Sequence, residues 1–136
     1  MPEARVVWKE GLQFEAHAPS GHTLILDSPL GTNAGPSPTG LLLVALAGCT
    51  AMDVISILQK QRQPVTGLEV VVRAERTEEH PRVYTGYEVT YIVHGAGVDR
   101  AAVERAVALS EEKYCSVGAM LGRSAPIRHT IQMDET

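Results

Sequence analysis

Two cysteines, at positions 49 and 115, are the residues of this chain with the clearest chemical potential. Cys49 lies inside a long apolar run, and Cys115 follows the charged segment 110–114. If the helices predicted to carry them pack together, the two thiols can form a dithiol/disulfide couple. The alternative is structural, because a free cysteine is often a small buried apolar residue. The two cysteines alone leave both interpretations open.

The sequence predicts neither a metal site nor a cofactor. It contains no Cys-x-x-Cys pair and no Cys/His cluster with the spacing of zinc ligands. The histidines are scattered, and we expect them to be solvated strand and turn residues: His17, His22, His80, His94 and His129.

Composition excludes several classes of protein. The length of 136 residues predicts a single domain, 1–136, that buries its own core. The net charge of −4 and the few aromatic residues argue against a nucleic-acid partner. Residues 1–5 lack the apolar run of a secretory signal, so we expect a cytoplasmic protein. Disulfides in that compartment are usually transient and catalytic.

Periodic patterns predict the strands. Apolar and polar residues alternate at 12–17 and in two long segments, 68–75 and 83–93, that a hairpin loop joins. Two further short strands are expected beside turns, at 5–9 before Glu10-Gly11 and at 23–27 after the turn at 19–21. A last strand is expected at 127–133.

The first predicted helix has a clear start, with Ser37 as N-cap and Pro38 as first residue. It should end near Arg62, before Pro64. Its centre, 41–58, is apolar enough to approach a membrane span. We reject that reading because of the charge at Asp53 and the amphipathic strands on both sides, so the helix should be buried nearly all round.

The second predicted helix begins after Asp99, which is a good N-cap. Its inner stripe is expected to be Val103, Ala106, Val107, Ser110 and Tyr114. Ser116 is expected to cap a further short helix that ends at Leu121.

The expected order is βββ-α-ββ-α-β, with a short extra helix after the second one, which indicates an α+β fold with one antiparallel sheet. A six-stranded sheet and the second helix cannot cover the whole apolar surface of the first helix. Apolar patches of that size mark interfaces, so we predict a homodimer with the first helix near its interface.

Peroxide chemistry at a thiol needs a thiolate. A helix N-terminus can assist Cys115 if a helix restarts at Ser116, whereas Cys49, deep within a helix, needs a cation from elsewhere. Gly48 either opens space for a substrate or permits close helix packing, and the sequence does not decide between the two.

Three segments resemble the OsmC/Ohr family and, within it, the YhfA-like branch: 35–39, 48–54 and 110–117. The resemblance covers nearly the whole chain. It implies two intertwined subunits whose sheets wrap central helices, with active sites at the dimer interface. It also implies reduction of organic hydroperoxides, with Cys49 as peroxidatic nucleophile, Cys115 as resolving thiol in a Cys49–Cys115 disulfide, and a lipoyl-type dithiol as reductant.

Two positions depart from the family pattern. Well-studied Ohr-type members carry an early Arg that supports the thiolate, but the corresponding turn, 9–12, reads Lys-Glu-Gly-Leu. They also carry a Glu just after the Pro that opens the first helix, where this chain has Thr39. The resemblance therefore assigns no activating group to Cys49.

The leading hypothesis is a cytoplasmic, homodimeric thiol peroxidase for organic hydroperoxides, with no nucleic-acid or membrane partner. Two rivals remain. One is a module that binds a small apolar ligand, with the cysteines as passive lining of its site. The other is a redox sensor in which the Cys49–Cys115 bond reshapes a surface for a partner.

Overall fold

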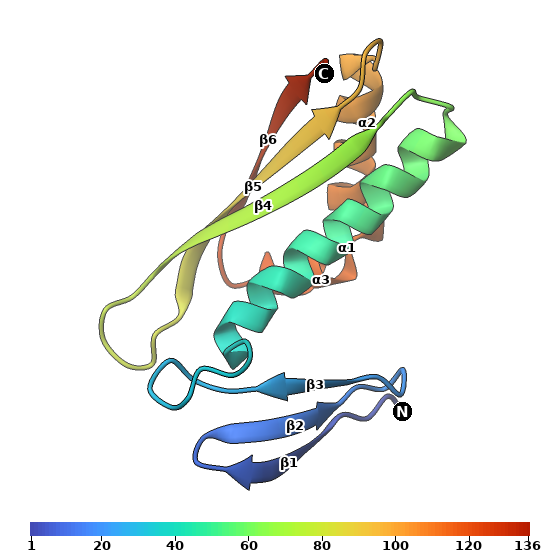
Figure 1. The fold of residues 1–136 in the computed structure, drawn as a ribbon. Coiled ribbons are helices and arrows are strands. Elements are labelled where there is room, and N and C mark those ends of the chain that lie inside the picture. The colour runs from blue at the N-terminus through green and yellow to red at the C-terminus, as the bar shows by residue number, and fades with distance from the viewer. The chain divides into compact units, whose positions relative to one another are not determined.

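The computed structural model describes residues 1–136, which form two compact units, Met1–Leu42 and Leu43–Thr136. Figure 1 shows the elements in chain order. Their bounds are β1 Arg5–Glu10, β2 Gln13–His17, β3 Thr23–Leu26, α1 Pro38–Lys60, β4 Gly67–Arg76, β5 Tyr84–His94, α2 Arg100–Leu109, the π-helical turn η1 Ser110–Tyr114, α3 Ser116–Leu121 and β6 Ile127–Asp134.

The first unit is an antiparallel sheet in the order β1-β2-β3. Gly11, with a φ of +53°, makes the turn between β1 and β2. The loop after β3 is organised by Asp27, whose carboxylate accepts hydrogen bonds from Thr32 Oγ1 at 2.7 Å and Ala34 N at 3.0 Å. These bonds lower the pKa of Asp27, so the carboxylate stays ionised although its side chain is buried.

The second unit has a sheet in the order β4-β5-β6. β4 and β5 form the predicted antiparallel hairpin, but β6 runs parallel to β5. The expectation of one antiparallel six-stranded sheet is therefore wrong in two respects, the number of sheets and the direction of the last strand. A connection that contains helices can return a strand in parallel, and alternation along a strand does not reveal its direction.

The core of the second unit lies between its helices and its sheet. Helix α1 contributes one stripe at a spacing of four residues, namely Leu46, Thr50, Val54 and Leu58. Buried side chains of β5 and α2 complete the cluster, among them Val89, Tyr91, Val93, Val103 and Ala106.

Helix α1 is not buried all round within one chain, in line with the expectation that one chain leaves part of its apolar surface uncovered. Val44 is 60% exposed and Met52 is 73% exposed. By length and composition alone, α1 would also fit a membrane span, as the core helices of many soluble proteins do.

The region after α2 departs from a regular helix. Asp99 caps α2 as predicted, because its carboxylate accepts a hydrogen bond from Ala101 N at 3.0 Å. The next residues form η1, whose wider turn changes the side-chain directions. Ser110 is buried as expected, but Tyr114, predicted on the inner stripe, is 51% exposed. The π-helical turn thus reorients the chain just before Cys115.

Candidate functional site

The two cysteines lie side by side in the folded chain. Both are free thiols, with Cys49 half-buried on α1 and Cys115 buried between η1 and α3. Their Sγ atoms and a carboxylate oxygen of Asp53 all lie within 4.8 Å of one another. A disulfide needs a sulfur–sulfur distance of about 2.0 Å, so the pair is near but not bonded.

Local structure explains how these residues meet. Cys49 and Asp53 are four residues apart on α1 and therefore share one face of the helix. Cys115 takes an extended conformation (ψ of 98°), and its N–H donates to Ser110 O at 2.8 Å. The chain therefore turns sharply at Cys115 and starts α3 there.

Cys115, rather than the predicted Ser116, is the N-cap of α3. Its Sγ accepts a hydrogen bond from Gly118 N at 3.2 Å. A helix does restart at Ser116, but the residue before it provides the side-chain acceptor.

Burial dominates the acidity of Cys115. Desolvation, followed by a hydrogen bond with Cys49, raises the pKa of the Cys115 thiol to about 11. The Gly118 N–H acts in the opposite direction, and the negative charges of Cys49 and Asp53 add to the rise. Cys115 is therefore a protonated thiol at neutral pH, since one backbone N–H does not offset burial.

Asp53 is the residue of this cluster that sequence reasoning missed. The sequence analysis considered Asp53 only as a charge within an apolar helix. Its spacing of four residues from Cys49 could have indicated that the two side chains share one helix face. Ser110 Oγ, fully buried, donates a hydrogen bond to Asp53 Oδ2 at 2.9 Å. This bond links α1 to η1 and orients the carboxylate.

A cavity of about 200 Å³ adjoins Cys115. Its walls combine apolar and polar side chains: Leu46, Thr50, Glu111, Cys115, Gly118, Gly122, Ile127 and His129. Next to the other cysteine, a side chain at Gly48 would meet nothing within 4 Å, so close helix packing within the chain does not account for this glycine.

His129 belongs to this cavity and is not a solvated strand residue, which corrects the expectation for that histidine. Its side chain is 12% exposed, and its ring stacks on Tyr91 with centroids 5.8 Å apart. The Tyr91 hydroxyl and His129 Nδ1 are hydrogen-bonded at 2.8 Å. Burial lowers the pKa of His129, although Glu111, 3.6 Å from Nε2, opposes the shift.

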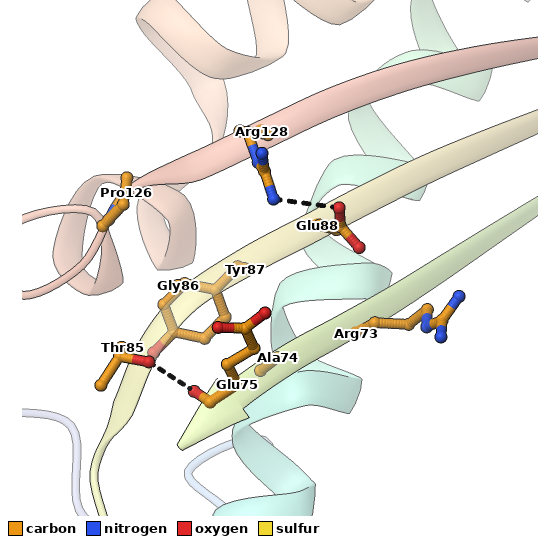
Figure 2. Close-up of a pocket in the computed structure, with 9 residues that line it drawn as sticks. All are labelled: Arg73, Ala74, Glu75, Thr85, Gly86, Tyr87, Glu88, Pro126 and Arg128. Carbon is orange, nitrogen blue, oxygen red and sulfur yellow. Dashed lines mark hydrogen bonds and ion pairs between the residues drawn. The ribbon is translucent and has the colours of Figure 1, made fainter. Parts of the chain in front are cut away.

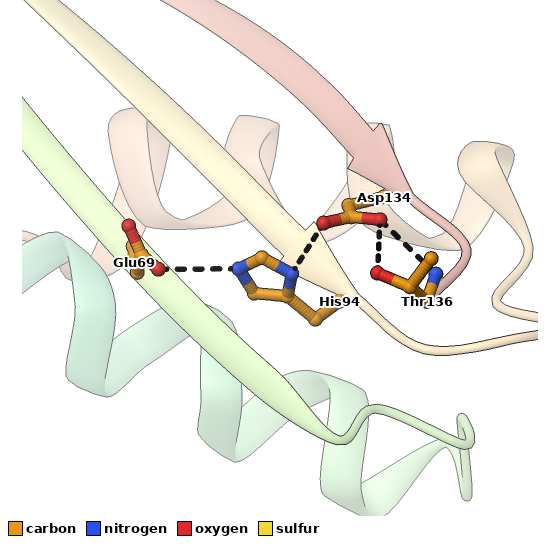
Figure 3. A network of polar contacts seen from close by, with 4 residues as sticks. All are labelled: Glu69, His94, Asp134 and Thr136. Carbon is orange, nitrogen blue, oxygen red and sulfur yellow. Dashed lines mark hydrogen bonds and ion pairs between the residues drawn. The ribbon is translucent and has the colours of Figure 1, made fainter.

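Two further polar clusters lie on the sheet of the second unit. A cavity of about 410 Å³ is lined by Arg73, Glu75, Glu88 and Arg128, among others, and an Arg128–Glu88 ion pair at 3.0 Å borders it (Figure 2). His94 joins β4, β5 and β6 through Glu69 and Asp134, at 3.3 and 2.9 Å (Figure 3). Neither cluster includes a cysteine.

Comparison with known proteins gives consistent matches. A family model described as OsmC-like protein matches residues 31–130. Protein YhfA of Escherichia coli strain K12 is 47% identical over 131 residues, which cover 96% of this chain and 97% of that protein.

Solved structures share the fold. A hypothetical protein from Aquifex aeolicus has a TM-score of 0.87 at 32% identity, covering 100% of this chain and 98% of that one. The organic hydroperoxide resistance protein OhrB of Bacillus subtilis has a TM-score of 0.64 at 13% identity, covering 97% and 98% of the two chains. At that identity, the second likeness concerns the fold alone.

Proposed function

Because this chain belongs to the OsmC-like protein family, we propose that it is a homodimeric, cytoplasmic thiol peroxidase that reduces organic hydroperoxides. The observation that carries the proposal is the meeting of two free thiols, from α1 and from the start of α3, within 4.8 Å. Two free thiols this close together support the formation of a reversible disulfide.

The environments of the two sulfurs support different roles. Cys115 is buried, and its pKa is raised to about 11, which suits a thiol that stays protonated until Cys49 is oxidised. Cys49 is half-buried beside the open space at Gly48, which suits a sulfur that an incoming peroxide reaches first. We assign Cys49 as the peroxidatic residue and Cys115 as the resolving residue.

The proposed cycle has three balanced steps. The Cys49 thiolate attacks the peroxide ROOH and breaks its O–O bond, giving a Cys49 sulfenic acid and, after protonation, the alcohol ROH. The Cys115 thiol then condenses with the sulfenic acid to form the disulfide and water. An external dithiol of the lipoyl type exchanges with the disulfide, becomes a disulfide itself and restores both thiols.

The apolar walls that Leu46 and Ile127 contribute to the cavity beside Cys115 support a substrate or reductant with an organic tail. The sequence assigns no activating group to Cys49. The charges that raise the pKa of the neighbouring Cys115 are both negative, from Cys49 and Asp53. We therefore propose that a second subunit contributes the positive group, which makes the homodimer part of the active site.

Thiol counting during peroxide treatment tests the proposal. One equivalent of cumene hydroperoxide should convert both thiols of the reduced protein to a disulfide, whereas Cys49→Ser should consume no peroxide. Cys115→Ser should form a Cys49 sulfenic acid that dimedone traps and mass spectrometry locates. Serine keeps an acceptor at the cap of α3, so this variant is preferable to alanine. Survival of both thiols, or a Cys49→Ser variant as active as the parent, would contradict the proposal.

The cavity beside Cys115 also favours a second candidate, the binding of a small apolar ligand without catalysis. On this view the thiols only line the site. A ligand should then raise the melting temperature of a Cys49→Ser/Cys115→Ser protein as much as that of the parent. Stabilisation that requires the thiols would count against it.

A further inference from the structure

The cluster formed by Cys49, Asp53 and Cys115 combines two soft sulfur ligands with a carboxylate. We propose that it binds one thiophilic divalent cation, with the chemistry of Zn²⁺, when the protein is reduced. The proposed function needs the same two sulfurs for a disulfide, so bound metal and peroxide would compete for them. That competition rests on the proposed function, whereas the binding site itself rests on the geometry of the cluster.

The distances fit such a site. The three potential ligand atoms lie within 4.8 Å of one another. A tetrahedral zinc ion with Zn–S distances of about 2.3 Å places its sulfurs about 3.8 Å apart, so small side-chain rotations are sufficient. Two ligands are four residues apart on α1, and the third lies at the fixed turn before α3. Three protein ligands leave the fourth position for water, as in open zinc sites.

Hydrogen bonds already orient two of the three ligands. The buried Ser110 hydroxyl donates to Asp53 Oδ2 at 2.9 Å, which leaves Oδ1 available for a cation. The Gly118 N–H donates to Cys115 Sγ at 3.2 Å, and a thiolate accepts that bond better than a thiol does. Outer contacts of this kind fix ligand geometry at metal sites.

The charge of the cluster favours a cation. Two thiolates and the Asp53 carboxylate would repel one another at this distance unless positive charge lay between them. Sulfur ligands select zinc-like ions over Mg²⁺ or Ca²⁺, which prefer all-oxygen sites. Binding Zn²⁺ would release the two thiol protons and give a zinc bis-thiolate.

Peroxide would then release the metal ion from the site. One zinc bis-thiolate, one ROOH and two protons give the Cys49–Cys115 disulfide, ROH, water and free Zn²⁺. The peroxide is the oxidant, and the two sulfurs lose the two electrons that cleave the O–O bond. Because the bound metal occupies both sulfurs, it should slow both the alkylation and the oxidation of the thiols.

Titration with Co²⁺, a spectroscopic substitute for Zn²⁺, tests the site in reduced, chelator-treated protein without oxygen. We expect one Co²⁺ per chain, sulfur-to-cobalt charge-transfer absorption, the visible bands of tetrahedral cobalt, and displacement by Zn²⁺. Asp53→Asn keeps the size of the side chain and an oxygen for Ser110, but should weaken binding at least about tenfold. Glu112→Gln, an exposed change on η1, is the matched control and should bind as the parent does.

Absence of the charge-transfer band in the parent would overturn the site, and so would unchanged affinity in an Asp53→Asn protein that retains its denaturation midpoint. One Co²⁺ per two chains would overturn a site within one chain. Peroxide consumption by metal-free protein is a separate measurement. Metal binding without peroxide consumption would support the metal site and contradict only the proposed peroxidase. Peroxide consumption without metal binding would contradict only the metal site.

Discussion

At the residue scale, burial and a few directed hydrogen bonds give similar groups different properties. The thiol of Cys115 is buried against Cys49 and Asp53, and its pKa rises to about 11. His129 lines the same cavity as Cys115, and there burial shifts the pKa of His129 downwards, because the charged form of an imidazole is the cation. Both pKa shifts favour the neutral form of the side chain, so burial around this cavity disfavours ionisation of Cys115 and of His129.

The pKa shift of His129 predicts a pH dependence of stability. Its pKa is below the usual 6.5 in the folded chain, so the unfolded chain binds more protons as the pH falls. The stabilising effect of neutral His129 is therefore complete above pH 6.5 and is lost as the pH falls from there through the folded pKa. Glu111 and the Tyr91 hydroxyl face the ring, and only Glu111 favours the cation.

Urea unfolding at about pH 8 and about pH 5 checks this prediction. His129→Gln keeps a polar partner for Tyr91 and should reduce the loss of stability between the two pH values. His22→Gln, at an exposed turn residue, is the control and should leave the loss unchanged. Equal pH dependence in the parent and His129→Gln would contradict the assignment.

At the element scale, the turn η1 decides which residues of the α2–α3 segment face the core. Ser110 points inward to Asp53, Tyr114 is exposed, and Cys115 caps α3. A regular helix through 110–114 would present a different set of side chains. The position of α2 therefore matters for the site, because η1 continues directly from it.

The N-cap of α2 should contribute measurably to stability. Asp99→Ala removes the acceptor for Ala101 N and should lower the free energy of unfolding by about 1 kcal/mol. Asp99→Asn is the matched control, because asparagine caps helices about as well as aspartate. Denaturant midpoints of the three proteins check the effect. Equal losses in both variants would indicate that charge, rather than the cap hydrogen bond, is responsible.

At the scale of the whole molecule, the apolar surface of α1 exceeds what one chain covers. Val44 and Met52 remain well exposed, although the centre of the helix is almost entirely apolar. Water-exposed surface of this kind is typical of an interface. In the proposed homodimer, a second copy of the chain covers this surface of α1.

The homodimer predicts a specific response to mutation. Val44→Lys places a charge on the exposed face of α1 and should shift the protein from twice the chain mass of 14.6 kDa toward the single-chain mass. Val83→Lys, at an exposed residue before β5, is the control and should leave the mass unchanged. Size-exclusion chromatography with light scattering measures both. A parent that is monomeric at micromolar concentration would contradict the prediction.

Local patterns were sufficient for most elements of the chain. Alternation and turn residues located all six strands, and Ser37-Pro38 and Asp99 located the starts of α1 and α2. These signals work because strand alternation and helix capping depend on neighbouring residues. The resemblance of three segments also identified the family, which the family model and the similarity to YhfA confirm.

Other features arose only from tertiary structure. No local signal predicted the parallel pairing of β6, the π-helical turn, the approach of Asp53 to Cys115, or the half-buried position of His129. Each depends on contacts between residues distant in the chain, such as Ser110 with Asp53 and Tyr91 with His129. The sequence by itself determined that the two cysteines are the candidates for chemistry and in which part of the fold each one lies. Packing decided which of them meet, because desolvation and hydrogen-bond partners exist only after the chain has folded.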